Sequence, residues 1–260
     1  MSDLKFDADM ARLQQALAQC HDMVVRRTAM LDALNLRTGE QVFEFGCGGG
    51  FYAYEAAQFV GASGRVSGID ISADQTSAAR ERCKDLAHVE FQVADIADIP
   101  FGENAFDVVF GVQVLEYVAD LERAVSEIGR VIRTGGRFAV LATNWSSVVW
   151  NSDDRERMER VLEVWDGHAP FPNLPALLPE RLRRNGFQVT QQRAVPIINA
   201  VYSDNSFSRW LAPMVKGYVV GQGVLPADVV EEWAAEFAEL DQRGAYWFSS
   251  TPVLTEAVKV

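Results

Sequence analysis

The sequence has few of the residues that build disulfide frameworks or metal centres. Its 260 residues include 3 cysteines and 3 histidines. The cysteines (Cys20, Cys47 and Cys83) lack Cys-x-x-Cys spacing, and the histidines form no His-x-x-x-His motif and no cluster with cysteine. We therefore expect reduced thiols, as in a cytoplasmic protein, and no metal site.

Basic residues and long apolar runs are also scarce. Lysine and arginine total 24 against 36 acidic residues, a formal net charge of −12. An acidic surface repels phosphate backbones and anionic lipid, so nucleic acid is not an expected partner. No apolar run approaches the roughly 20 residues of a membrane-spanning helix, and residues 1–9 lack a signal-peptide pattern. We expect a cytoplasmic protein, monomeric or homodimeric, that acts on a small molecule.

Short apolar segments alternate with helical patterns in the first part of the chain. The segments are rich in Val, Ile and Phe, as parallel strands buried on both faces are. Such alternation predicts an α/β fold with a doubly wound sheet, whose ligand site lies along the carboxyl ends of the strands. The expected strands are 41–45, 65–69, 89–93, 106–110 and 137–142, and the expected helices are 51–60, 73–86 and 121–132.

The alternation stops after Thr143. The later segments include expected helices at 153–164 and 177–184 and a long strand from Phe187 towards Tyr202. Neither repeats nor a low-complexity linker divide the chain, so we interpret residues 1–260 as one domain. Its expected parts are N-terminal helices in 1–35 (at 8–19 and 22–34), a core in 36–143, cap insertions at 144–172 and 203–243, and a final strand at 245–260.

A glycine-rich turn follows the first core strand. Residues 42–50 read Val-Phe-Glu-Phe-Gly-Cys-Gly-Gly-Gly, and a helical pattern begins at Phe51. Glycine permits positive φ angles and lets a ligand approach the backbone closely. The spacing Gly48-x-Gly50-x-x-Ala53 also fits a dinucleotide fingerprint, so a nicotinamide-dependent oxidoreductase is one alternative. No Gly-Lys-Ser/Thr follows, which excludes a P-loop.

The charges around this turn favour a cationic ligand. Glu44 precedes the first glycine by two residues, and no Lys or Arg occurs from Thr38 to Gly64. A pyrophosphate is repelled by a neighbouring carboxylate, whereas a sulfonium and an ammonium are attracted to it. S-adenosylmethionine carries both cations and no phosphate, so Glu44 favours this methyl donor over a nicotinamide dinucleotide.

Acidic residues also follow the second and third expected strands. Asp70 ends the second strand, where a carboxylate suits the ribose hydroxyls of a nucleoside, and Ile71 can lie against the adenine face. Asp95 follows the third strand, where it can accept a hydrogen bond from the adenine amino group. Each aspartate alone also fits a helix cap or a turn. Their succession at strand ends favours a nucleoside site.

Five motifs occur in order within Leu36–Thr143. They are Glu44-Phe-Gly-Cys-Gly-Gly-Gly50, Gly68-Ile-Asp-Ile-Ser72, Ala94-Asp-Ile96, Phe106-Asp-Val-Val-Phe-Gly-Val-Gln-Val-Leu-Glu116 and Arg130-Val-Ile-Arg-Thr-Gly-Gly-Arg137. Together they resemble the class I S-adenosylmethionine-dependent methyltransferases and, more narrowly, the small-molecule branch related to quinone-biosynthesis C-methylases (methyltransferase type 11).

The resemblance implies a seven-stranded Rossmann-like sheet with an antiparallel last strand and S-adenosylmethionine as cofactor. It implies methyl transfer to carbon, nitrogen or oxygen of a small aromatic or hydrophobic metabolite. A catalytically silent S-adenosylmethionine-binding module is a further alternative. The residues expected to line the cofactor site are Glu44, Gly46, Cys47, Gly48, Asp70, Ile71, Gln75, Asp95, Ile96 and Gln113.

Two residues of the capping region are candidate catalytic groups. His168 lies in an irregular segment, Asp166-Gly-His-Ala-Pro170, and an ordinary histidine pKa near 6.5 suits a general base. Tyr202, expected at the end of the long strand, is the alternative. A role for His168 within its loop, through a hydrogen bond, is the competing interpretation.

Overall fold

The computed structural model describes residues 17–260. The helix expected at 8–19 lies almost entirely outside the described residues, whereas the second expected helix is present as α2 (His21–Leu34). Across residues 17–260, none of the helices combines the length and the apolar character needed to cross a membrane.

One mixed sheet organises the molecule. Its strand order is β3-β2-β1-β4-β5-β8-β6, and β7 pairs with β8 beyond that path. The pairs among β1 to β5 are parallel, while β8 runs antiparallel to β5, β6 and β7. The predicted doubly wound sheet with an antiparallel last strand is thus confirmed. The strands are β1 (Gln41–Phe45), β2 (Arg65–Asp70), β3 (Val89–Val93), β4 (Phe106–Val112), β5 (Ile132–Trp150), β6 (Phe187–Ala194), β7 (Ile197–Asn199) and β8 (Phe248–Lys259).

The described sheet has eight strands where seven were expected, because the long sixth strand is divided. β6 ends at Ala194 and β7 begins at Ile197, with Pro196 between them. Proline has no backbone N–H to donate to a neighbouring strand, so the ladder is interrupted there. Tyr202 therefore follows β7 in a loop and does not end the sixth strand as predicted.

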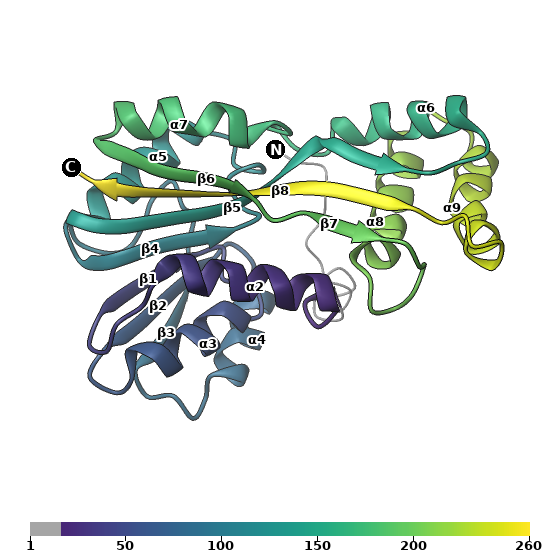
Figure 1. Ribbon diagram of the computed structural model, residues 1–260. Coiled ribbons are helices and arrows are strands. Elements are labelled where there is room, and N and C mark those ends of the chain that lie inside the picture. The colour runs from purple at the N-terminus through teal and green to yellow at the C-terminus, as the bar shows by residue number, and fades with distance from the viewer. Residues whose placement is uncertain (1–16) are drawn as a thin grey trace.

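Helices cover both faces of the parallel strands (Figure 1). On one face, Phe43 and Phe45 of β1 pack in a core with α5 and α7. On the other, Val42 packs in a core with α2, α3 and α4. Side chains alternate between faces along a strand, so β1 contributes to both cores. The helices after α2 are α3 (Phe51–Val60), α4 (Ala73–Arg82), α5 (Leu121–Val131), α6 (Arg155–Asp166), α7 (Leu174–Arg184), α8 (Phe207–Gln222) and α9 (Ala227–Gln242).

β5 extends well beyond its predicted end at Ala142. After a register shift between Asn144 and Val149 it continues to Trp150, paired with Phe248 of β8. The first expected cap insertion therefore begins as a strand, and the second, expected as an irregular and partly helical stretch of a helical cap, contains two regular helices. Both insertions meet in one helical unit, formed by α6, α8 and α9, at the far end of β5 and β8 (Figure 1).

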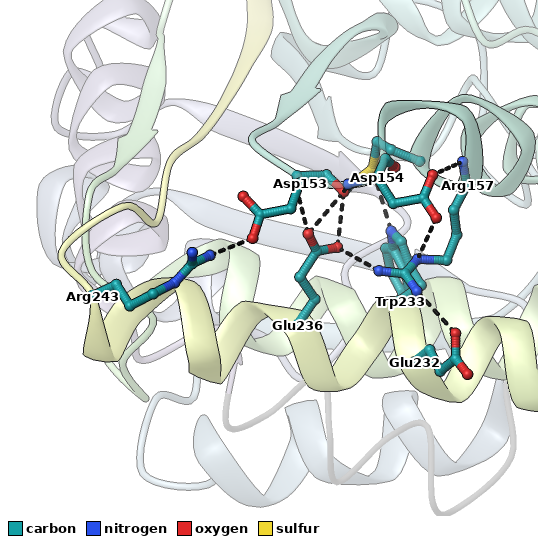
Figure 2. Close-up of polar contacts among 9 residues, drawn as sticks. Asp153, Asp154, Arg157, Glu232, Trp233, Glu236 and Arg243 are labelled. Atoms are coloured by element: carbon teal, nitrogen blue, oxygen red, sulfur yellow. Dashed lines mark hydrogen bonds and ion pairs between the residues drawn. The ribbon is translucent and has the colours of Figure 1, made fainter.

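A buried carboxylate joins two helices of this unit. The Glu236 side chain, on α9, accepts hydrogen bonds from the Ser152 hydroxyl at 2.8 Å, the Asp153 backbone N–H at 2.5 Å and the Arg157 guanidinium at 3.0 Å. Asp154 caps the start of α6 by accepting from the Arg157 N–H at 2.9 Å. Figure 2 shows Asp153, Asp154, Arg157 and Glu236 converging between the two helices. The Glu236 network therefore holds α9 against the start of α6.

Candidate functional site

The glycine turn lies between β1 and α3, and its glycines serve different purposes. The backbone φ is +63° at Gly46, +49° at Gly48 and +75° at Gly50. A Cβ on Gly46 would lie 2.2 Å from the Val114 side chain, so packing excludes any larger residue there. At Gly48 the nearest atom to such a Cβ is the Gln75 amide oxygen at 4.0 Å. Gly48 is thus the position where the backbone is open to a ligand.

Glu44 is buried within this turn. Its side chain is 2% exposed, and its Oε2 atom accepts no hydrogen bond from residues 17–260. Burial, with a smaller contribution from the Asp70 charge, raises the pKa of Glu44 well above its usual value. A cation placed beside Glu44 would reverse this effect, whereas a pyrophosphate would be repelled.

Asp70 connects the turn to the end of β2. One carboxylate oxygen accepts from the Gly48 N–H at 2.9 Å and the other from the Ser72 N–H at 2.9 Å. Burial raises the pKa of Asp70, while these two N–H groups oppose the increase. Ile71, the next residue, is 66% exposed, as an apolar contact for a ligand face would be. The structure thus brings Gly48, Asp70 and Ile71 together as the sequence predicted.

The other predicted cofactor residues differ in their surroundings. Gln75 is buried on α4 with its amide oxygen beside Gly48 and Gly49. Cys47 is buried, its N–H donates to Ile69 at 2.9 Å, and burial raises the pKa of its thiol. Asp95 is exposed and accepts from the Ala97 N–H at 2.8 Å. This contact is the turn expected from the sequence as the alternative to adenine binding. Ile96, by contrast, is buried in the core.

Residues 113–117, named here the exit loop, leave the carboxyl end of β4. Gln113 has a positive φ of 60°, which is uncommon for a residue other than glycine. Its side-chain oxygen accepts from the Arg26 guanidinium at 2.5 Å and from the Thr143 hydroxyl at 3.0 Å. Val114 fills the space beside Gly46, so the exit loop lies directly against the glycine turn.

Glu116 is a second buried carboxylate at this edge. Its Oε1 accepts from the Thr143 N–H at 2.9 Å, and its Oε2 has no hydrogen-bond partner among residues 17–260. Burial raises the pKa of Glu116 to about 7. Sequence reasoning assigned no role to Glu116 or to Arg26. Glu116 ends the fourth quoted motif, whereas Arg26 lies in a helix outside all five and had no local signal.

His168 lies in an aromatic cluster next to the exit loop. Its ring stacks on Trp165 with centroids 3.7 Å apart, and the ring of Tyr117 is 5.8 Å away. The Nδ1 atom is 2.6 Å from the Trp165 carbonyl oxygen, and burial lowers the pKa of His168 to about 4. The irregular segment was predicted, but the ordinary pKa assumed for this histidine is wrong, because its side chain is fully buried.

Tyr202 lies among different neighbours. Its ring packs on Phe237 and Tyr246, its N–H donates to Asp241, and its hydroxyl accepts from Arg209 at 3.4 Å. None of these neighbours is among the rings that contact His168, so the described contacts do not bring the two candidates together. Over residues 17–260, no group of three or more His, Cys, Asp or Glu side chains is arranged to hold a metal ion.

Comparisons with known proteins agree with this geometry. Residues 43–140 match a family model described as a methyltransferase domain. An uncharacterised 37.1 kDa protein in a transposon of Streptomyces fradiae is 38% identical over 130 residues, 50% of this chain and 38% of that protein. A ubiquinone/menaquinone biosynthesis C-methyltransferase of Cellvibrio japonicus is 33% identical over 114 residues, 43% of this chain and 46% of the relative. The chain thus spans less than half the length of these two relatives.

A solved structure extends the similarity over most of the chain. A structure titled as a putative methyltransferase from Bacillus halodurans has a TM-score of 0.63 and 20% identity, covering 90% of this chain and 98% of that one. The fold of the chain is thus that of this solved structure, and residues 43–140 resemble a methyltransferase domain. The matched segment is also similar to a quinone-biosynthesis C-methyltransferase.

Proposed function

We propose that this chain binds S-adenosylmethionine across the glycine turn and transfers its methyl group to a small aromatic or hydrophobic metabolite. The observation that carries the proposal is the position of the exit loop. At one end Val114 touches the glycine turn, and at the other Tyr117 contacts the aromatic cluster around His168. A methyl group held beside Gln113 would therefore lie next to aromatic side chains.

The proposed cofactor contacts follow the charges of the site. Glu44 would attract the cationic part of the cofactor, and Asp70 would accept hydrogen bonds from the ribose hydroxyls. Ile71 and Ile96 would pack on the adenine, Asp95 would accept from its amino group, and the remaining predicted residues, Gly46, Cys47, Gly48, Gln75 and Gln113, would line the site. S-adenosylmethionine supplies the electrophilic methyl group when it is bound.

Positioning would supply most of the proposed acceleration. Methyl transfer is an in-line displacement, for which alignment of the acceptor and exclusion of water lower the barrier. The acceptor atom, whether carbon, nitrogen or oxygen, would approach from the side of the aromatic cluster. Its apolar side chains would exclude water from that approach.

His168 is the proposed general base, with Tyr202 as the alternative. An imidazole whose pKa is about 4 stays neutral at physiological pH and can accept a proton. It is a weak base, so it would act only on an acceptor that becomes strongly acidic as the methyl bond forms. The position of His168 beside Tyr117 and Trp145 supports it, with ring centroids 5.8 and 4.7 Å away.

Two measurements test the proposal. Calorimetric titration should give saturable binding of S-adenosylhomocysteine and none of NADH, which separates the methyltransferase from the nicotinamide-dependent oxidoreductase. Radiolabelled methyl transfer from S-adenosylmethionine to a panel of phenols, quinols, aromatic amines and terpenoids should then identify an acceptor. Binding without transfer to any compound would instead favour a catalytically silent module, and binding of NADH alone would reject the proposed function.

A further inference from the structure

Arg26 is a buried cation on the α2 face that meets the exit loop. Arg26 is 2% exposed. One terminal nitrogen donates to the Gln113 oxygen at 2.5 Å and the other contacts the Met23 sulfur at 3.5 Å. The third nitrogen, Nε, is buried and has no hydrogen-bond partner among residues 17–260. A buried guanidinium with unused donors is costly, and it calls for a compensating anion.

The residues that the structure describes do not supply that anion at ion-pair distance. Within residues 17–260, no carboxylate lies within 4.0 Å of Arg26, although its neighbour Arg27 is paired with Glu55 at 2.8 Å. The Glu116 charge favours the protonated guanidinium from farther away, but Glu116 is itself bonded to the Thr143 N–H, and its pKa of about 7 leaves it only partly ionised at neutral pH. Among the described residues, Arg26 thus differs from Arg27 in lacking a carboxylate within ion-pair distance.

The position of Arg26 identifies the space that an anion would occupy. Gln113, its hydrogen-bond partner, adjoins Val114, which packs against Gly46 of the glycine turn. Burial lowers the pKa of Arg26, and the nearby Tyr52 phenol, in the first turn of α3, opposes this decrease. The guanidinium therefore faces the region between the glycine turn, the start of α3 and the exit loop, where the methionine part of the cofactor would lie.

We propose that Arg26 binds the α-carboxylate of S-adenosylmethionine; this inference rests on the proposed function. The turn is flanked by the carboxylates of Glu44 and Asp70 and has no Lys or Arg from Thr38 to Gly64. Arg82 of α4 contacts the turn, but its guanidinium already donates to the Gly49 carbonyl at 2.7 Å and lies over the Phe51 ring, which leaves Arg26 for the single anionic group of the cofactor. Glu44 would attract the cationic part of the cofactor, and Arg26 would bind its α-carboxylate. The helix α2, outside the matched residues 43–140, then completes the cofactor site.

The test compares two ligands that differ by one carboxylate. S-adenosyl-3-thiopropylamine keeps the nucleoside, thioether and amine of S-adenosylhomocysteine but lacks its carboxylate. By calorimetry, the unaltered protein should prefer S-adenosylhomocysteine by roughly 10- to 100-fold, the range for a hydrogen bond between charged groups. Arg26→Met should reduce this preference to about threefold or less by weakening S-adenosylhomocysteine alone.

Two further variants make the comparison decisive. Arg26→Lys should restore part of the preference, because it keeps the charge without the planar donor pair. Arg27→Met, which removes a buried arginine one residue away, should leave the preference intact. Equal affinity of the unaltered protein for both ligands would overturn the proposal even if Arg26→Met does not fold. Equal weakening of both ligands by Arg26→Met would do the same. Failure of the unaltered protein to bind S-adenosylhomocysteine at all would instead reject the proposed function itself.

Discussion

The buried carboxylates of the ligand edge, the edge formed by the carboxyl ends of the parallel strands, differ in their hydrogen bonds from the buried carboxylate of the helical unit. In the helical unit, Glu236 is almost fully buried and accepts from a hydroxyl, a backbone N–H and a guanidinium. At the ligand edge, Glu44 and Glu116 are equally buried, yet each has an oxygen without a hydrogen-bond partner among the described residues. Buried polar groups in native proteins are normally satisfied. The difference indicates that Glu236 maintains the structure, whereas the ligand edge retains bonding capacity for a ligand.

The largest loss of stability should come from breaking the Glu236 network. Glu236→Ala leaves the Arg157 guanidinium and the Asp153 N–H without their shared acceptor, and removal of one partner from a buried ion pair costs about 3–5 kcal/mol. Denaturant unfolding should show a loss of this size, with the affinity for S-adenosylhomocysteine unchanged. Glu239→Ala, an exposed change on the same helix, should cost less than about 0.5 kcal/mol. A comparable loss for both variants would mean that the network contributes nothing specific.

Glu116→Gln should change the pH dependence of stability. The unfolded carboxyl titrates near its ordinary value of 4.5, whereas the folded pKa is about 7, so the folded protein holds a proton that the unfolded chain has already lost. The contribution of Glu116 to stability should therefore fall as pH rises from 4.5 to about 7, whereas the lowered pKa of His168 acts in the opposite direction and is common to both proteins.

The glutamine keeps the acceptor for the Thr143 N–H but does not ionise. Relative to the unaltered protein, the variant should become more stable by about 3–4 kcal/mol across this interval, with no further gain above it. Unfolding free energies measured at several pH values test this. Parallel curves for the two proteins would show that Glu116 is not held protonated.

Glu44→Gln should separate binding from stability. Removing the negative charge should weaken S-adenosylhomocysteine by about 1.5–3 kcal/mol, the value of a hydrogen bond to a charged group. The unliganded protein should be no less stable, because burial of this carboxylate is itself unfavourable. Calorimetry and denaturant unfolding on the same samples measure both. A stability loss without a change in affinity would mean that Glu44 stabilises the fold, as Glu236 does, and does not bind the ligand.

The smallest effect is expected for an exposed ion pair of the helical unit. Arg155 and Glu159 lie 2.7 Å apart on α6, but their side chains are 90% and 63% exposed. Solvent screens such pairs, so Arg155→Ala should alter stability by less than about 0.5 kcal/mol. Thermal unfolding at low and high salt checks this, and a salt-sensitive loss above 1 kcal/mol would contradict it.

The sequence predicted best the features that depend on neighbouring residues. α3 matches its predicted bounds, Phe51–Val60, because glycines flank an uninterrupted apolar pattern. The positions of Glu44 and Asp70 followed equally directly, since each lies at the carboxyl end of a short buried strand. Tips of adjacent parallel strands meet at one edge of the sheet, so local patterns were enough to bring these groups together.

Features that depend on distant partners were missed. The extension of β5 through Trp150 depends on pairing with Phe248 of β8. Ser146 and Ser147 interrupt the apolar pattern of β5 before Trp150, so the chain carries no local sign of a longer strand. Arg26 reaches Gln113 across 87 positions, a contact that the local helical pattern cannot reveal. The lowered pKa of His168 likewise results from burial by Trp145 and Trp165, which only the folded cap brings around it.

The placement of β8 has a consequence for biosynthesis. This strand comes last in chain order, yet it lies inside the sheet, between β5 on one side and β6 and β7 on the other. Until residues 248–259 leave the ribosome, β6 and β7 have no partner strand and the far half of β5 has an open edge. Pairings of such long sequence separation form slowly and expose aggregation-prone edges. The nascent chain should therefore depend on chaperones up to its final strand, with the helical unit and the ligand edge becoming protease-resistant only after synthesis of β8.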